Sequence, residues 1–192
     1  RQCLHNHAFE PLVFSDTADS WGARTPQFRI LAGKFTLMSK AEGSAFSAVE
    51  GGPIDSVRVI EDGPVRSIVE AVFGYRRSAI CQRYILGKTG TEMEIETRVY
   101  WNEKDHMLKL AIPFKGGDYT LIGQTAYGRT ECDAVQGEGV AQKWLAAVSP
   151  KKDLAMTCIN DSTYGYDFAD NQLRLTLLRS PAYCGAKCLR SE

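Results

Sequence analysis

The feature that most constrains the fold is a strict alternation of side chains between residues 92 and 101. One set is mostly apolar and comprises Met93, Ile95, Thr97, Val99 and Trp101; the other is mostly charged and comprises Glu92, Glu94, Glu96, Arg98 and Tyr100. Successive side chains of a β-strand point to opposite faces of a sheet. The alternation therefore predicts a strand whose first set faces the core and whose second set faces solvent.

Similar signals recur along the chain, and no long stretch has the apolar spacing of a helix. We expect further strands at 67–77, 80–85, 107–112, 119–129, 154–159 and 173–178, with the strand at 107–112 buried more on one face. Turn signals such as Gly87-Lys-Thr-Gly90 separate them. Residues 140–148 have helical propensity, but their place among strands and before Ser149-Pro150 favours a strand. The Gly-rich segment 131–139 is expected to be a long loop.

Strands at regular spacing with turns between them are typical of a large antiparallel β-sandwich. The 192 residues suffice for one domain with a sizeable core. We therefore predict an all-β fold with a single domain over residues 1–192.

Charge and hydropathy exclude two classes of partner. Lys and Arg total 23, as do Asp and Glu, so the formal net charge is zero. Binding to nucleic acid or to an anionic membrane surface needs basic patches, which this sequence lacks. No apolar run approaches the roughly 20 residues of a membrane span, and no signal peptide is visible. We expect neither nucleic acid nor membrane as a partner.

The six cysteines are too few for a disulfide scaffold in a chain of this length; they are Cys3, Cys81, Cys132, Cys158, Cys184 and Cys188. Cys81 and Cys158 lie inside apolar strand patterns and are interpreted as buried thiols. Cys184 and Cys188 have no nearby His to complete a zinc site. We interpret the cysteines as free thiols of a reducing compartment, which favours the cytoplasm, with a Cys184–Cys188 disulfide as the alternative.

A polar turn between two predicted strands is the main candidate site. Cys158-Ile-Asn-Asp-Ser-Thr-Tyr-Gly-Tyr-Asp167 is followed by Leu173-Arg-Leu-Thr-Leu-Leu-Arg-Ser-Pro181. Asn, Asp and Ser form turns because their side chains bond nearby backbone groups. Two tyrosines beside two carboxylates exceed what a turn needs and suit sugar recognition; the alternative is a polar turn with packing tyrosines. The predicted pocket residues are Asn160, Asp161, Tyr164, Tyr166 and Asp167.

Other candidate sites are weaker. Cys3, His5 and His7 would share one face of a strand, at a spacing that can bind zinc or copper, but no fourth ligand is evident. Gly137-Glu-Gly139 lacks the third Gly and the strand–helix context of a phosphate loop, so Glu138 is interpreted as a solvated loop carboxylate. We predict no metal site and no catalytic residue in this chain.

Four segments, in order, resemble the C-terminal β-domains of α-mannosidases of glycoside hydrolase family 38. They are Asp16-Thr-Ala-Asp-Ser-Trp-Gly22, Val59-Ile-Glu-Asp-Gly-Pro-Val-Arg66, Glu138-Gly-Val-Ala-Gln-Lys-Trp144 and the Asn160–Asp167 turn with its flanking strands. The resemblance implies a β-supersandwich like that of galactose mutarotase-like domains. It also implies that both ends are truncated, so that the chain is a fragment of a multidomain glycosidase with an edge strand open to homo-oligomer pairing.

The resemblance implies a function in mannose metabolism. The full-length parent would be a retaining α-mannosidase with a catalytic Asp and a zinc ion, both in its N-terminal catalytic domain. This chain has no His-x-Asp metal pair, so it would hold no cofactor itself. Its partners would be the catalytic domain of the same polypeptide, whose sugar pocket it helps to shape, and α-mannosides.

Individual residues qualify that inference. Paired carboxylates are the machinery of glycosidases, but Asp16 and Asp19 are interpreted as caps of the turn before Trp21-Gly22. Ser162 stands where some relatives carry Arg, which removes a cationic substrate contact. Two alternatives stay open: a stand-alone lectin-like module that binds carbohydrate, and a purely structural or oligomerisation domain.

Overall fold

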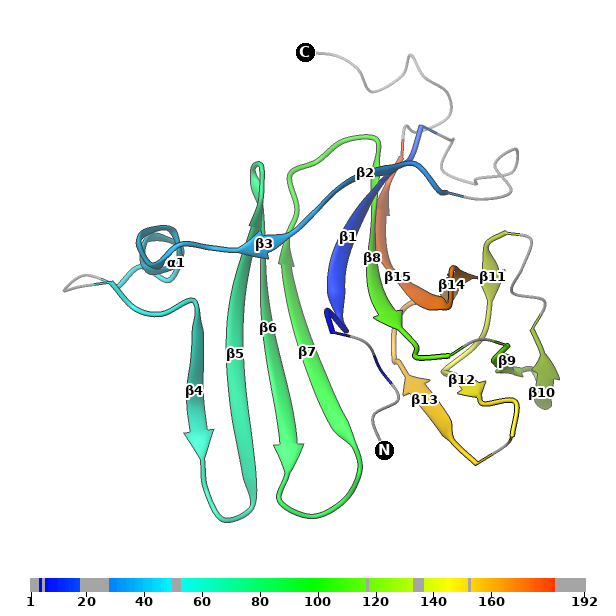
Figure 1. Ribbon diagram of the computed structural model, residues 1–192. Coiled ribbons are helices and arrows are strands. Elements are labelled where there is room, and N and C mark those ends of the chain that lie inside the picture. The colour runs from blue at the N-terminus through cyan, green and yellow to red at the C-terminus, as the bar shows by residue number, and fades with distance from the viewer. Residues whose placement is uncertain are drawn as a thin grey trace. The chain divides into compact units, whose positions relative to one another are not determined.

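The computed structural model describes residues 4, 6–17, 28–49, 53–116, 118–132, 137–151 and 153–181. Over these residues the chain forms antiparallel β-sheets and one short helix (Figure 1), which confirms the predicted all-β fold. The chain divides into two compact units, residues 1–33 with 104–192 and residues 34–103. Each unit is described by itself, and the single domain over 1–192 stays a prediction.

The first unit contains two sheets. The six-stranded sheet has the order β11 (Gly139–Val140), β14 (Gly165–Ala169), β15 (Gln172–Ser180), β8 (His106–Pro113), β1 (Glu10–Ser15) and β2 (Leu31–Lys34). The four-stranded sheet has the order β10 (Gly128–Glu131), β9 (Thr120–Thr125), β12 (Trp144–Val148) and β13 (Ala155–Ile159). The strand predicted within residues 140–148 is thus confirmed.

An apolar core joins these two sheets into a sandwich. The six-stranded sheet contributes Ile112, Tyr166 and Leu173, while the four-stranded sheet contributes Leu121, Leu145 and Ala147. All are less than 5% exposed. Burial of this apolar surface stabilises the unit. A second apolar cluster lies on the six-stranded sheet and comprises Leu12, Phe14, Phe28, Met107 and Ala111.

Strand β8 differs from its prediction. Residues Met107–Ile112 are buried on both faces, not on one, and Lys109 is 0% exposed. The period-two pattern could not reveal this, because Lys109 resembles a solvent-facing residue until its buried partners are known.

The second unit is built on a five-stranded sheet. β3 (Thr36–Leu37) and β4 (Val57–Asp62) both pair with β5 (Arg66–Tyr75), which continues through β6 (Ser78–Gly87) to β7 (Met93–Tyr100). The alternation predicted for β7 is present, but the side chains expected to face the core are less buried than predicted. Ile95, Thr97 and Val99 are half-buried between exposed neighbours, and Met93 is exposed.

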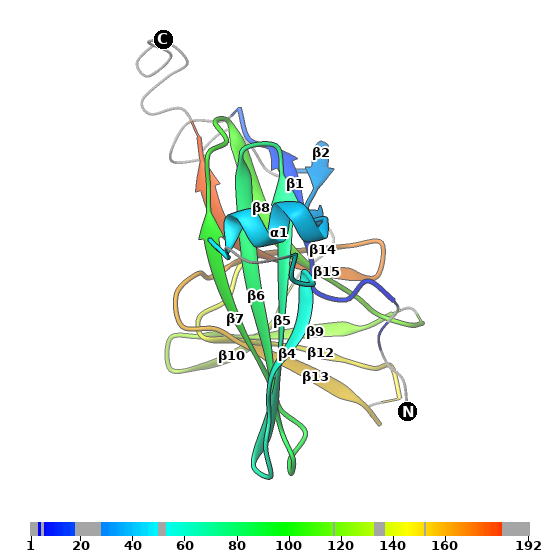
Figure 2. The ribbon, with the colours of Figure 1, turned by 90° about the vertical axis from the view of Figure 1, so that its left-hand side faces the viewer.

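Helix α1 (Lys40–Phe46) was not predicted. Its local signal is a capping box, in which the Ser39 hydroxyl accepts from Glu42 N and the Glu42 carboxylate accepts from Ser39 N. With only seven residues, the helix is too short to show an apolar period. Figure 2 shows that it runs crosswise to the strands of its sheet.

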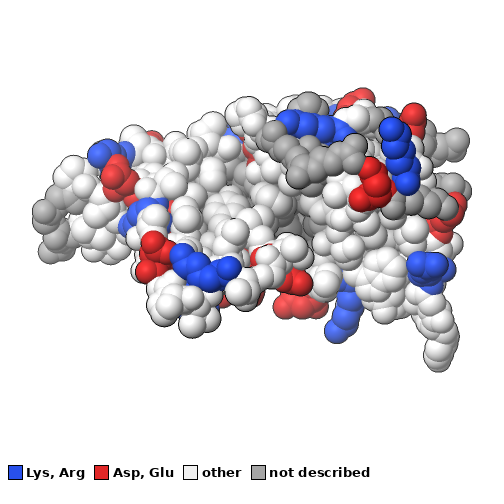
Figure 3. Space-filling model, turned by 60° about the horizontal axis from the view of Figure 1, so that its bottom comes forward, with Lys and Arg blue, Asp and Glu red and all other residues white. Residues whose placement is uncertain are grey.

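Surface charge is mixed. On the face shown in Figure 3, basic and acidic side chains are interspersed among uncharged residues. Within the described part of the chain, no helix is long and apolar enough to cross a membrane.

Candidate functional site

The predicted strands at 154–159 and 173–178 are confirmed as β13 and β15, but the turn between them is shorter than predicted, because Tyr166 and Asp167 lie in a further strand, β14. The five predicted pocket residues do not form one cluster. Asp161 is exposed and Tyr164 is 39% exposed, whereas Tyr166 and Asp167 are 4% and 3% exposed. The turn therefore divides into an exposed part and a buried part.

The neighbouring segment 141–143 holds both ends of the turn. Asn160 N donates a hydrogen bond to Lys143 O at 2.8 Å, and Ala141 N donates to Tyr164 O at 3.0 Å. The side-chain oxygen Oδ1 of Asn160 is buried and accepts no hydrogen bond from any residue that the structure describes. Such an acceptor is uncommon in native proteins and favours a donor supplied by water or by a ligand. The turn is thus a fixed loop that contains one buried acceptor with no donor among the described residues.

Tyr166 packs in the core between the two sheets of the first unit. Gly139 of β11 lies opposite it in the register, and a Cβ at Gly139 would stand 2.5 Å from Tyr166 Cζ. Only a glycine allows that approach, so Tyr166 and Gly139 together fix the pairing of β11 with β14.

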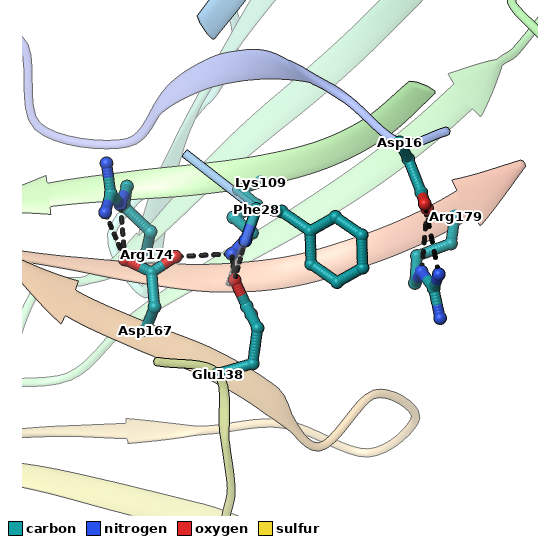
Figure 4. Close-up of polar contacts among 7 residues, drawn as sticks. All are labelled: Asp16, Phe28, Lys109, Glu138, Asp167, Arg174 and Arg179. Carbon is teal, nitrogen blue, oxygen red and sulfur yellow. Dashed lines mark hydrogen bonds and ion pairs between the residues drawn. The ribbon is translucent and has the colours of Figure 1, made fainter. Parts of the chain in front are cut away.

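Asp167 follows Tyr166 and points to the opposite face of β14, as alternation requires. There it lies opposite Arg174 of β15, whose Nε donates to Asp167 Oδ1 at 2.6 Å. Lys109 of β8 forms an ion pair with the other carboxylate oxygen, Asp167 Oδ2. Figure 4 shows Asp167 between the two cations. Three strands therefore meet at one buried carboxylate.

Glu138 completes this cluster, although the sequence indicated a solvated loop residue. Its Oε1 forms an ion pair with Lys109 Nζ and accepts a hydrogen bond from Phe28 N at 3.3 Å. The physical reason is charge balance: Lys109 and Arg174 are two buried cations, and Asp167 supplies only one negative charge. Burial of an unpaired charge is strongly unfavourable.

We call Lys109, Glu138, Asp167 and Arg174 the buried ionic cluster. The Phe14 ring lies beside both of its cations, 5.5 Å from Lys109 Nζ and 5.2 Å from Arg174 Cζ. Because every carboxylate is engaged by a cation, the cluster is suited to fixing strands and loops and not to proton transfer.

A second ion pair forms at Asp16, whose predicted role as a cap of the following turn concerns residues outside the described ones. Asp16 is fully buried and accepts from Arg179 Nε at 2.8 Å and from Arg179 Nη2 at 3.1 Å. The Arg179 guanidinium also lies 4.7 Å from the centre of the Phe28 ring. Figure 4 shows this ring between the Asp16–Arg179 pair and the buried ionic cluster. The other cap, Asp19, lies outside the described residues, as do Trp21 and Gly22.

The sequence did not lead us to predict that the cations of these contacts are buried. Lys109 and Arg174 each stand alone among apolar residues of a strand. A single cation in an apolar run is the available signal, because such a side chain needs a buried anion. The identity of that anion depends on strand order, which local patterns do not contain.

The described cysteines are free thiols: Cys81, Cys132 and Cys158. Cys81 and Cys158, which were predicted to be buried thiols, are half-buried. Burial raises the pKa of Cys158 to about 11, so this thiol is neutral at physiological pH. Cys3, Cys184 and Cys188 lie outside the described residues.

Metal binding finds no support where side chains are described. There, no group of three or more His, Cys, Asp or Glu side chains is placed to hold a metal ion. Of the strand considered as a candidate, Cys3 and His5 lie outside the described residues.

Known proteins resemble this chain over most of its length. Residues 1–184 match the family described as the glycosyl hydrolases family 38 C-terminal domain. Alpha-mannosidase G of Dictyostelium discoideum is 27% identical over an alignment of 183 residues, which covers 88% of this chain and 15% of that protein. The chain therefore spans a small part of this relative.

A crystal structure of an alpha-mannosidase from Enterococcus faecalis V583 has a similar fold. The TM-score is 0.67 with 13% sequence identity, and the match covers 91% of this chain and 22% of that one. At this identity the likeness is evidence of fold alone. The family match rests on the sequence of residues 1–184, which is nearly the whole chain. The chain belongs to the family of glycosyl hydrolase family 38 C-terminal domains.

Proposed function

We propose that this chain is the non-catalytic C-terminal β-domain of a zinc-dependent, retaining α-mannosidase. It would pack on the catalytic domain of the same polypeptide and present the turn at residues 160–164 to the sugar pocket. The observation that carries the proposal is the family match over residues 1–184, supported by the α-mannosidase relatives. Because the chain covers only a fraction of each relative, the catalytic machinery is assigned to the rest of the parent protein.

The geometry of the turn supports a division of labour among the predicted residues. Asp161 and Tyr164 are exposed, so these two can meet sugar hydroxyls and a sugar ring, whereas Asn160 Oδ1 is buried beneath them. Tyr166 and Asp167 belong to β14 and anchor it on both faces: Tyr166 packs in the apolar core, and Asp167 forms an ion pair with Lys109. They would support the pocket from behind without touching the sugar.

Zinc is assigned to the catalytic domain of the parent. The described residues of this chain offer no set of ligands that fits it. No step of the glycosidase reaction is therefore routed through this chain. A reducing compartment, the cytoplasm, is proposed for the parent because the described cysteines are free thiols.

The test uses the full-length parent enzyme with Tyr164→Ala and Asp161→Ala. Loss of a hydrogen bond or a ring contact to substrate is expected to lower kcat/KM for an α-mannoside by about tenfold. Tyr127→Ala is the matched control, because Tyr127 is a fully exposed tyrosine in another turn of the same unit. Unchanged kcat/KM in both turn variants, or an equal loss in Tyr127→Ala, would contradict the proposal.

A second candidate function, a lectin-like module, is favoured by the same exposed turn. Mannose and α-mannobiose titrated by NMR against the isolated chain separate the two. Binding that Tyr164→Ala abolishes would make the turn a sugar site in its own right. No shift at millimolar sugar would leave a pocket that forms only beside the catalytic domain.

A further inference from the structure

The second unit carries a groove that the proposed function does not use. Its volume is about 240 Å³. Its lining comes from the end of α1 and from β4 to β7, chiefly Phe46, Arg58, Glu70, Cys81, Arg98 and Tyr100. Pockets for drug-sized ligands measure about 300–1,000 Å³. This smaller groove suits a ligand of about one ring with one substituent.

Two residues of the lining, Arg58 and Glu70, belong to a row of alternating charges that crosses the sheet. The register places Glu70 between Arg58 of β4 and Arg83 of β6. Arg58 Nε donates to Glu70 Oε1 at 3.0 Å, and Arg83 Nε donates to Glu70 Oε2 at 2.8 Å. Both oxygens of this carboxylate, which is 4% exposed, are therefore engaged by arginines. The negative charge of Glu70 is neutralised from two sides and does not dominate the groove.

Arg98 is the cation that remains. It lies opposite Cys81, two residues along the strands from the row that contains Glu70, and its side chain is exposed. Its guanidinium makes no hydrogen bond or ion pair with any residue that the structure describes. Arg58 and Arg98 against Glu70 leave the lining with one positive charge in excess. A guanidinium with free donors binds carboxylate, sulfate or phosphate oxygens in a bidentate manner.

An aromatic ring stands on the same face of β7. Tyr100 follows Arg98 by two residues and is 53% exposed. Phe46 of α1 packs edge-on against it, with ring centroids 5.1 Å apart and an interplanar angle of 82°. This contact fixes the orientation of the Tyr100 ring at little further cost in side-chain entropy. The groove thus combines an oriented ring with an available guanidinium.

We propose that this groove binds an acidic sugar, a pyranose ring that carries one carboxylate, sulfate or phosphate group. Arg98 holds the anionic group, and the sugar ring lies against Tyr100 beside Phe46. The site is separate from the turn at residues 160–164. The proposal does not depend on whether that turn contacts mannosides.

The test is a titration of the whole chain with glucuronate, glucose 6-sulfate, glucose 6-phosphate and glucose, followed by NMR. The acidic sugars are expected to bind at least about tenfold more tightly than glucose, because a hydrogen bond to a charged group is worth about 1.5–3 kcal/mol. Arg98→Ala is expected to remove that preference. Comparison of the three acidic sugars identifies which anionic group the groove binds. Tighter binding of any one of them than of glucose supports the proposal.

Arg77→Ala is the matched control, because Arg77 is an exposed arginine in the turn between β5 and β6, outside the groove. Alkylation of Cys81, followed by mass spectrometry, gives a second readout. A bound acidic sugar is expected to slow labelling of Cys81 and to leave that of Cys132 unchanged. Equal binding of glucose and the acidic sugars, or binding that Arg98→Ala does not weaken relative to Arg77→Ala, overturns the proposal.

Discussion

At the scale of single residues, Asp167 matters more for stability than its place beside a polar turn suggests. It is the carboxylate on which Lys109 and Arg174 converge. Buried ion pairs contribute little net stability, but loss of one partner leaves an uncompensated charge. The residue is therefore expected to be hard to replace even if no substrate ever touches it.

Asp167→Asn is expected to lower the free energy of unfolding by about 3 kcal/mol or more, because two buried cations lose one of their two anions. Urea denaturation of the whole chain measures this change. Asp161→Asn is the control; Asp161 is exposed on the same turn, and a change within about 0.5 kcal/mol is expected there. Equal losses in the two variants would show that Asp167 does not act through the buried cluster.

Glu70 gives a prediction for pH. Burial by itself would raise the pKa of Glu70, but hydrogen bonds from Arg83 and Arg58 outweigh burial and hold that pKa below its ordinary value of 4.5. A carboxyl group whose pKa is lowered by folding stabilises the native state fully above the ordinary pKa. That contribution is lost as the pH falls through the lowered native value.

Glu70→Gln is therefore expected to reduce stability most near neutral pH. The difference from the wild-type chain should shrink as the pH falls below 4.5. Urea denaturation at a series of pH values between about 7 and 3 measures both curves. A difference that stays constant over that range would rule out the lowered pKa of Glu70 as its cause.

At the scale of elements, the short pairing of β11 with β14 depends on one glycine. Gly139→Ala is expected to destabilise the chain by about 1–3 kcal/mol, because the new Cβ would overlap the buried Tyr166 ring. Thermal unfolding measures this change. Gly128→Ala in β10 is the control, since a Cβ there meets nothing within 4 Å. Similar melting temperatures for the two variants would contradict the close approach of Gly139 to Tyr166.

The sequence predicts elements better than their contacts. Alternation and turn residues locate the strands from β5 to β8 closely, because each pattern is local. Helix α1 was missed because one capping box is its only signal. The partners of Asp16 and Glu138 were missed for a different reason: Arg179 and Lys109 are distant in sequence, and only strand order brings them together. The start of the candidate turn was located correctly, but its end was not, because Tyr166 and Asp167 belong to β14 and are buried by the same tertiary packing.

At the scale of the whole molecule, the proposed division between this chain and a catalytic domain can be tested directly. The isolated chain with zinc is expected to give no turnover of an aryl α-mannoside above the buffer rate, because the proposed function assigns the catalytic residues to the rest of the parent protein. The full-length parent serves as the positive control. Robust turnover by the chain alone would contradict its role as a non-catalytic domain.

The division into two units has a consequence for synthesis on the ribosome. The first unit draws on both ends of the chain, whereas the second is continuous from residue 34 to residue 103. Strand β1 is translated early, yet its partner β8 is translated only after the whole second unit. The second unit has all its strand partners at hand before β8 leaves the exit tunnel, so we expect it to fold first. During that interval the apolar strand β1 has only the short strand β2 beside it and lacks β8 on its other edge, and this is when we expect the nascent chain to be most prone to aggregation.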